Sequence, residues 1–149
     1  ATTADLTITA TAPQVLSVSL GSDVSFTLDA AGGTVSLGSL SVLSNLKSWV
    51  LRVWSVNGSK LKNTDTTPEE ITYTVDLVAT TPVAGITTGT LQSSRPSSGT
   101  GYILVSGKTP KAGVSLPLSI TYSGEGISTF WSYDKGNFTD TINVEVAAN

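Results

Sequence analysis

The chain has 149 residues, a net charge of −3, and no cysteine, histidine or methionine. Its length fits one domain. The missing residue types exclude disulfides and thiolate catalysis, and they remove the commonest metal ligand and the usual general base. Only 13% of the residues are charged, about half of the usual share of roughly 25%, and the acidic balance argues against a nucleic-acid partner.

The first twelve residues form a small, threonine-rich segment that Pro13 separates from the rest. Leu6, Ile8 and Ala10 alternate with threonines, which is the two-residue period of a β-strand. One interpretation is the first strand of the chain's own domain, or a frayed end. The other is a donor strand, which completes the sheet of a neighbouring copy and fills a groove there with Leu6, Ile8 and Ala10.

The segment also bears on where the protein resides. The segment that starts at Ala1 has neither the charged start nor the apolar stretch of a signal peptide. This favours a mature secreted or cell-surface protein from which a signal has been removed, with a shortened chain as the alternative.

Short alternating segments continue along the chain, bounded by glycine, proline and asparagine. We expect strands at residues 16–20, 24–28, 35–37, 40–42, 49–54, 71–77, 86–91, 102–105, 114–122, 127–131 and 142–146. No convincing helix and no repeat of fixed period occurs.

Three of these segments allow more specific predictions. The strand from Trp49 to Trp54 is apolar on both faces apart from Arg52, which is typical of a central strand. Asn57-Gly58 follows it and predicts a hairpin, because both residues tolerate positive φ. Pro117 interrupts the alternation at 114–122 and predicts an edge strand or a bulge, because proline has no amide to donate.

About ten short strands, separated by glycine, proline and asparagine residues, indicate an all-β fold, an immunoglobulin-like Greek-key β-sandwich. A closed barrel is the alternative. We expect residues 1–12 to be an N-terminal extension and residues 13–149 to form a single domain.

Aromatic residues are the first candidates for ligand contact. Trp49 and Trp54 lie five positions apart, so on one strand they face opposite sides and cannot form one flat platform. Trp131 and Tyr133, with Trp54, are candidate contacts for a glycan. The simpler interpretation is that Trp49 or Trp54 fills the core and the others line its rim.

Ionisable groups offer no chemistry that stands out. Glu69-Glu70 is the one adjacent acidic pair, and we expect it in a solvated loop rather than at a glycosidase centre. Asp134 and Asp140 flank a turn but lack the spacing of a calcium loop. No G-x-S-x-G or S-x-x-K motif occurs. The sequence therefore predicts a protein that is not an enzyme and that holds no metal or cofactor.

Two covalent modifications fit short motifs. Asn57-Gly58-Ser59 and Asn137-Phe138-Thr139 match the N-glycosylation triplet, which is common by chance in a chain rich in serine and threonine. A Lys–Asn cross-link would use Asn143, but the first lysine is Lys47, too late for a partner on a first strand.

Two stretches resemble a known class of proteins: Val35-Ser36-Leu37-Gly38-Ser39-Leu40-Ser41-Val42 with Ser44-Asn45 and Trp49-Val50-Leu51-Arg52-Val53, and Gly136…Phe138…Asp140-Thr141-Ile142…Val144…Val146. They are similar to secreted bacterial pilin domains of the spore-coat-U and chaperone–usher type. The resemblance implies an incomplete immunoglobulin-like subunit, completed by the N-terminal strand of the next subunit. The chain departs from these pilins in having no cysteine, so cysteine-free donor-strand filaments of other bacteria or archaea are equally open.

We therefore expect a structural subunit of an extracellular filament, a pilus (fimbrium) or surface fibre, whose partners are other copies of itself. The alternative is a non-catalytic carbohydrate-binding or adhesin module that binds host or surface glycans. A hydrolase ranks last. No apolar run reaches the about 20 residues that span a bilayer, so no membrane span is expected.

Overall fold

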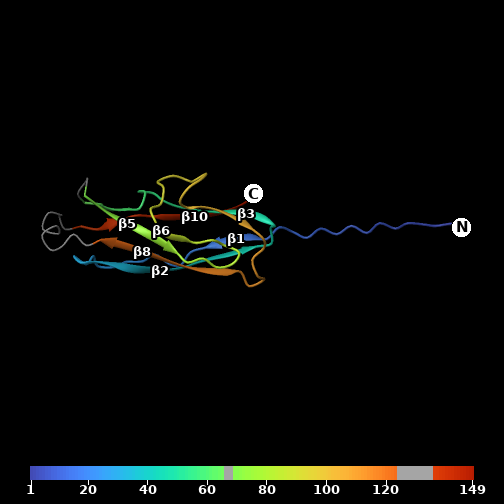
Figure 1. Ribbon diagram of the computed structural model, residues 1–149, viewed down its shortest axis with the longest axis horizontal. Helices are drawn as coiled ribbons and strands as arrows, with labels where there is room; N and C mark the ends of the chain where they lie inside the picture. The colour runs from blue at the N-terminus through green and yellow to red at the C-terminus, as the bar shows by residue number, and fades with distance from the viewer. Residues whose placement is uncertain (66–68, 124–135) are drawn as a thin grey trace.

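The computed structural model describes residues 1–65, 69–123 and 136–149. The described residues form ten strands in two antiparallel sheets, without a helix. The strands run along the long axis of the body, and the N-terminal residues leave it at one end (Figure 1). The strand expected at 127–131 lies outside the described residues, as do Trp131, Tyr133 and Asp134.

The larger sheet has seven strands. Its order is β1 (Leu16–Ser19), β2 (Gly32–Ser44), β8 (Val114–Ser123), β5 (Glu70–Leu77), β4 (Lys60–Asn63) and β9 (Phe138–Thr139), with β6 (Ile86–Gly89) paired to β5. The smaller sheet has the order β10 (Ile142–Ala148), β3 (Ser48–Ser55) and β7 (Tyr102–Ser106). The prediction of an all-β fold is confirmed.

One core lies between the two sheets, and the two-residue alternation of the strands builds it. In β5 and β8 every second side chain is buried, while the residues between them are exposed or half-buried. Trp49 of β3 is fully buried, and its Nε1 donates to the carbonyl of Gly107 at 2.9 Å. Burial of each large apolar side chain contributes about 1.5–3 kcal/mol, so the inward face of each strand stabilises the body.

The proline in β8 lies opposite a bulge. The register between β2 and β8 shifts between Ser36 and Ser39, and Gly38 has a φ of 85° there. Pro117 pairs with Ser39 at the end of this irregular stretch. The bulge expected from Pro117 is confirmed. The edge position is wrong, because β8 lies between β2 and β5, and the bulge of the neighbouring strand accommodates a residue without an amide hydrogen.

Asn57-Gly58 forms a turn but not a hairpin. The amide of Gly58 donates to the carbonyl of Ser55 at 3.2 Å, yet β3 belongs to the smaller sheet and β4 to the larger one. Ser59 lies where the chain passes from one sheet to the other: it has a φ of 62°, and its hydroxyl accepts the amide of Leu91, which is distant in the sequence, at 2.7 Å. The positive φ and this long-range bond accompany the passage of the chain to the larger sheet rather than back along β3.

Residues 24–28 do not form the expected strand. They belong to the segment 20–29, called the edge segment below, which connects β1 to β2. Phe26 and Leu28 are half-buried and pack against the core, so the alternation of the sequence is kept. No main-chain hydrogen bond joins residues 20–28 to another described residue, which is why this stretch has strand-like side chains without belonging to a sheet.

Candidate functional site

The first feature with functional meaning is the N-terminal segment 1–12, called the arm below. It leaves the body along the long axis (Figure 1). Its two large apolar side chains are almost fully in solvent, with Leu6 87% and Ile8 85% exposed. Ala10 is exposed as well. No hydrogen bond from residues 1–12 to another described residue occurs, so the arm does not form part of the core of its own chain.

The body holds the chain firmly just after the arm. Asn45, at the end of β2, uses both atoms of its side-chain amide: Oδ1 accepts the amide of Val15 at 2.8 Å, and Nδ2 donates to the carbonyl of Pro13 at 2.9 Å. The amide of Asn45 also donates to the carbonyl of Val15 at 3.1 Å. These bonds fix the root of the arm at residues 13–15 on the body.

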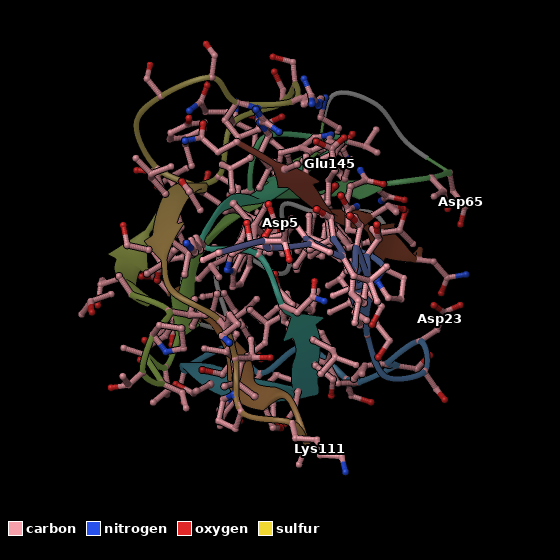
Figure 2. The ribbon with its side chains drawn as sticks, turned by 90° about the vertical axis from the view of Figure 1, so that its right-hand side faces the viewer. Asp5, Asp23, Asp65, Lys111 and Glu145 are labelled. Carbon is pink, nitrogen blue, oxygen red and sulfur yellow. The ribbon has the colours of Figure 1, made fainter. Side chains whose placement is uncertain are left out.

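The arm leaves the body near the middle of its cross-section. In a view along the long axis, Asp5 lies over the centre with Glu145 nearby, whereas Asp23, Asp65 and Lys111 lie at the periphery (Figure 2). The labelled charges do not gather into one patch. A segment that projects along the axis can reach a second body stacked on the same axis.

The smaller sheet has two edge strands, β7 and β10, and each of them pairs only with β3 among the described residues. The bonds at the ends of the β10 ladder, from the amide of Val56 to the carbonyl of Thr141 and from the amide of Asn149 to the carbonyl of Ser48, set its register. Bonding alternates along an antiparallel pair. The main-chain groups of Ile142, Val144 and Val146 therefore point away from β3.

The two edges differ in how well their apolar side chains are covered. On β7 the inward side chains are buried, with Ile103 7% and Val105 1% exposed. On β10 the corresponding side chains of Ile142, Val144 and Val146 are only partly buried where they pack on the core. The body is therefore incompletely closed along β10.

The incompletely closed side of the body, called the seam below, lies between β10 and the other sheet. β1 is the edge of that sheet and lies beside β10. The edge segment continues from β1 along β2, and a Cβ on Gly21 would lie 3.8 Å from the carbonyl oxygen of Leu37. Leu20 and Val24 of this segment remain 37% and 44% exposed. The seam thus carries unsatisfied main-chain groups and half-exposed apolar side chains together.

On the outer face of β10 a charged cluster connects the strand to a loop. The carboxylate of Glu145 accepts hydrogen bonds from Arg52 Nη1 at 2.8 Å and from Arg95 Nη2 at 2.6 Å. Arg52 also donates to the carbonyl of Pro96 at 3.0 Å and lies over the ring of Tyr102. The hydrogen bonds from Arg95, assisted by Arg52, lower the pKa of Glu145 below its usual value of 4.5. This cluster fastens a loop and offers no nucleophile.

A second polar cluster joins β5 to the start of β10. The hydroxyl of Tyr73 donates to Asp140 Oδ2 at 2.7 Å, and Oδ1 of the same carboxylate accepts the amides of Asn57 at 3.0 Å and Thr141 at 2.7 Å. Burial and the hydrogen bond to Asp140 raise the pKa of Tyr73 above its usual value. Both oxygens of the carboxylate accept hydrogen bonds from internal donors, two of them main-chain amides, which is the turn-stabilising arrangement that the sequence predicts for Asp140.

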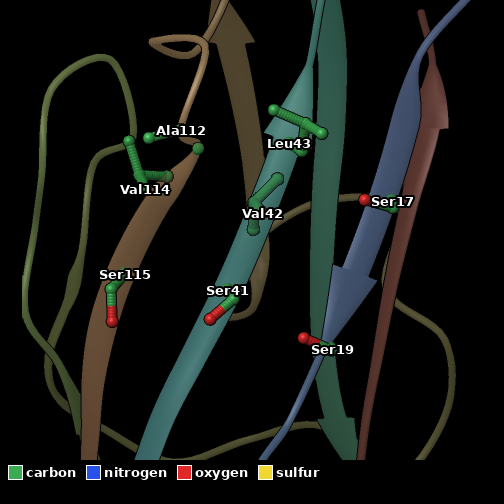
Figure 3. Close-up of a pocket in the computed structure, with 9 residues that line it drawn as sticks. Ser17, Ser19, Ser41, Val42, Leu43, Ala112, Val114 and Ser115 are labelled. Carbon is green, nitrogen blue, oxygen red and sulfur yellow. The ribbon is translucent and has the colours of Figure 1, made fainter.

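A shallow depression of about 200 Å³ lies on β1, β2 and β8 (Figure 3). Its polar lining consists of serine hydroxyls, from Ser17, Ser19, Ser41 and Ser115. It contains no ionisable side chain and no group that could act as an acid, a base or a metal ligand. The surface is polar through hydroxyls, which cost less to desolvate than charges.

The aromatic and acidic candidates are not brought together. Trp49 is buried, whereas Trp54 on the opposite face of β3 is half-buried, as the spacing predicts. Trp131 and Tyr133, the other candidate glycan contacts, lie outside the described residues. Glu69 Oε2 accepts the side-chain amide of Asn63 at 2.8 Å, and Glu70 pairs with Lys60 at 3.3 Å. No group of three acidic residues that could hold a metal ion occurs in the described residues.

The two glycosylation triplets differ in accessibility. The side-chain amide of Asn57 donates to the carbonyl of Thr139 at 3.1 Å, and Ser59 of the same triplet is fully buried. Asn137 and Thr139 of the second triplet are exposed. In the folded protein only the second triplet presents both of its defining side chains to solvent.

No family model, no curated protein and no solved structure matches this chain. Among the described residues there is also no helix of the length and hydrophobicity that crossing a membrane requires.

Sequence reasoning identified the arm but missed the seam. The alternation at residues 24–28 predicts an ordinary strand, and the alternation at residues 142–146 predicts β10 but does not indicate which edge of the sheet stays open. Arg52 in an otherwise apolar strand was a usable signal for its partner Glu145. The two lie directly opposite in the register of β3 and β10.

Proposed function

We propose that the protein is a structural subunit of an extracellular filament, such as a pilus or surface fibre, polymerised by donor-strand complementation through its arm. The observation that carries the proposal is the arm itself. It has the alternation of a strand, it has no contact with its own core, and it exposes Leu6 and Ile8 almost completely. A strand without a sheet can satisfy its main-chain groups and bury its apolar side chains by joining the sheet of another copy.

The energetics favour such a joint. Burial of Leu6 and Ile8 in a neighbour contributes about 1.5–3 kcal/mol each. The main-chain hydrogen bonds between the arm and the acceptor sheet set the orientation of the arm. A twelve-residue extended arm reaches about 40 Å at the strand rise of about 3.3 Å per residue. Because the donor and the acceptor are different surfaces of the same chain, the contact is heterologous and propagates instead of closing.

Within this proposal, the body is an immunoglobulin-like Greek-key sandwich that the incoming strand completes, and the protein is secreted to the cell surface. The projection of the arm along the long axis supports a head-to-tail arrangement. The hydroxyl-rich surface with few charges supports close packing between copies. No residue performs chemistry in this function, and no cofactor takes part in it.

Electron microscopy of the purified chain tests the proposal. The full-length protein should form filaments, and the double variant Leu6→Asp with Ile8→Asp should remain monomeric, because two carboxylates would have to be buried in the acceptor. The matched control is Thr7→Asp with Thr9→Asp, which adds the same charge to the opposite side of the same strand. Filaments of normal length and number from the Leu6/Ile8 variant would rule the proposal out.

The alternative, a carbohydrate-binding or adhesin module, rests on the half-buried Trp54 on the outer face of β3. It predicts a change of tryptophan fluorescence on titration with polysaccharides, and Trp54→Ala should reduce that change. No response to a panel of glycans would remove this alternative.

A further inference from the structure

We propose that opposite charges at the two ends of the body orient successive copies head to tail. Lys47, Lys108 and Lys111 lie at the end from which the arm leaves and are called the basic end below. The partner of the basic end is the acidic end of a second copy, which carboxylates at the opposite end of the body form. This inference rests on the proposed function, since it names the surfaces through which stacked bodies meet.

Two connections between strands, from β2 to β3 and from β7 to β8, build the basic end. The amide of Gly107 donates to the carbonyl of Lys47 at 2.8 Å, so the chain segments that carry Lys47 and Lys108 lie side by side. Lys111 follows in the second connection and lies at the periphery of the same end (Figure 2). Asn45 of the first connection holds the root of the arm. The lysines and the arm therefore project from one hydrogen-bonded end of the body.

The charge of the basic end is not neutralised within the described part of the chain. All three lysines are exposed, and none of them forms an ion pair with a described residue. Neither of the two connections contains an acidic residue. By contrast, Arg52 and Arg95 on the side of the body both bind Glu145. The positive charge of this end is therefore free to attract a partner.

The opposite end of the body has an excess of negative charge among the described residues. Four carboxylates lie just before β2 and at the connection from β4 to β5, against the two lysines of β4: Asp29, Asp65, Glu69 and Glu70, and Lys60 and Lys62. These four carboxylates are called the acidic end below. Asp29 and Asp65 are exposed and form no ion pair with a described residue. The acidic end can therefore receive the basic end of another copy.

The two ends are far enough apart to act as separate charges. The 13 residues of β2 connect them, and at about 3.3 Å per residue such a strand spans about 40 Å. Charges in solution are screened over about 8 Å at physiological ionic strength. The two ends of one copy therefore barely influence each other, whereas the facing ends of two stacked copies lie within the screening distance.

This asymmetry distinguishes the ways in which two bodies can meet end to end. A head-to-tail contact brings the basic end of one copy against the acidic end of the next, whereas a head-to-head contact brings like charges together. Opposite charges steer association, and like charges suppress the wrong arrangement. A head-to-head pair is closed, while a head-to-tail contact leaves a free surface at each end and propagates. The charges therefore favour the arrangement that grows into a filament.

The first experiment measures how salt affects growth. Wild-type monomers, separated from filaments by gel filtration, are added to short filament fragments, and light scattering follows elongation in sodium chloride at about 0.01 M and about 1 M, where the Debye length is about 30 Å and about 3 Å. Electrostatic steering raises association rates by about 10- to 1,000-fold, and for so few charges we expect the lower limit, elongation about tenfold slower at high salt. Burial of the apolar arm is not screened by salt.

The outcomes separate this inference from the proposed function. An elongation rate that is unchanged or rises with salt would overturn the inference and leave the donor-strand function intact. Absence of filaments at every salt concentration would refute the donor-strand function, and the inference with it.

The second experiment reverses the charge of each end. One variant carries Lys108→Glu with Lys111→Glu, another carries Asp29→Lys with Asp65→Lys, and a third combines all four changes. The combined variant keeps the net charge of −3, so it is the matched control for net charge. Each pair alone should slow elongation about tenfold at low salt, and the combined variant should recover most of this loss because its ends are again opposite. Urea unfolding of each variant confirms that it is folded.

The combined variant decides between interpretations. If it elongates no faster than the slower of the two pairs, the two ends do not meet, and the inference is overturned. If the lysine pair slows elongation and the aspartate pair does not, the basic end attracts some other anionic surface, and the inference is overturned as well. Recovery in the combined variant is the result expected only when the basic end of one copy faces the acidic end of the next.

Discussion

Replacement of Tyr73 by phenylalanine should change how the stability of the protein depends on alkaline pH. Tyr73 is 2% exposed, and its hydroxyl donates to the carboxylate of Asp140 at 2.7 Å. Burial first, and the hydrogen bond to Asp140 second, raise the pKa of this hydroxyl above its usual value of 10.0. The folded state thus keeps a proton on Tyr73 that the unfolded state releases.

The sign and the size of the effect follow from proton linkage. A group whose pKa is raised by folding contributes stability that is fully present below its unfolded pKa and is lost as pH rises toward its folded pKa. For Tyr73 the loss begins near pH 10, with a slope of about 1.4 kcal/mol per pH unit for one proton. Below that pH, Tyr73→Phe should lower the free energy of unfolding by about 1.5–3 kcal/mol, the range for a hydrogen bond to a charged group.

The free energy of unfolding of both proteins is measured by urea titration at a series of pH values from about 8 to 11. This range extends below and above the usual tyrosine pKa of about 10. Lysine titration affects both proteins equally, so the difference between the two free energies isolates Tyr73. We expect this difference to be constant up to about pH 10 and to shrink above it. A difference that stays constant across the whole range would refute the raised pKa and the buried bond behind it.

Further predictions concern the root of the arm, the charged cluster and two glycines. Asn45→Ala should shorten filaments or slow their growth while unfolding changes little, because it releases the root of the arm; light scattering and urea titration together separate the two effects. Glu145→Gln should destabilise the protein above the usual carboxyl pKa of 4.5, and the difference should vanish as pH falls through the lowered pKa of Glu145; equal differences at all pH values would contradict the ion pairing with Arg95. Gly101→Ala should destabilise more than Gly107→Ala in thermal unfolding, although both have positive φ, because only the first Cβ would collide with the carbonyl of Val53; equal losses of about 1–2 kcal/mol would mean that backbone strain alone decides.

The parts of the fold that the sequence predicts are those where one physical rule dominates. Alternation over eight residues of β5 buries one face and exposes the other, so its class and its inward residues can be read without knowledge of its neighbours. In β3, whose apolar residues lie on both faces in the sequence, Trp49 and Val53 are buried on one face and Val50 on the other, while Trp54 is half-buried. In these strands local pattern and tertiary environment agree.

The sequence predictions fail where the pairing of strands decides the structure. Alternation predicts that Phe26 and Leu28 face the core, and they do, but it carries no information on whether a neighbouring strand exists to form a ladder. Asn57-Gly58 predicts a turn, yet the chain then enters the other sheet, where the hydroxyl of Ser59 accepts the amide of the distant Leu91. Contacts between residues far apart in the sequence cannot be derived from local spacing, and the seam is made of such contacts.

Each of the two edges of the smaller sheet, β7 and β10, can pair with an unrelated strand, because an exposed edge is a template for unwanted pairing. On β7 the free edge is short, since Gly101 and Gly107, with φ of 89° and 103°, turn the chain immediately before and after the five-residue strand. β10 has seven residues and no such interruption, so it needs another form of protection. β1 of the same chain lies beside β10, and this proximity limits the approach of an unrelated strand. In the proposed filament, the difference between the two edges bears on specificity, because a strand that joins the smaller sheet meets a short edge between two glycine turns on β7 and a longer edge on β10.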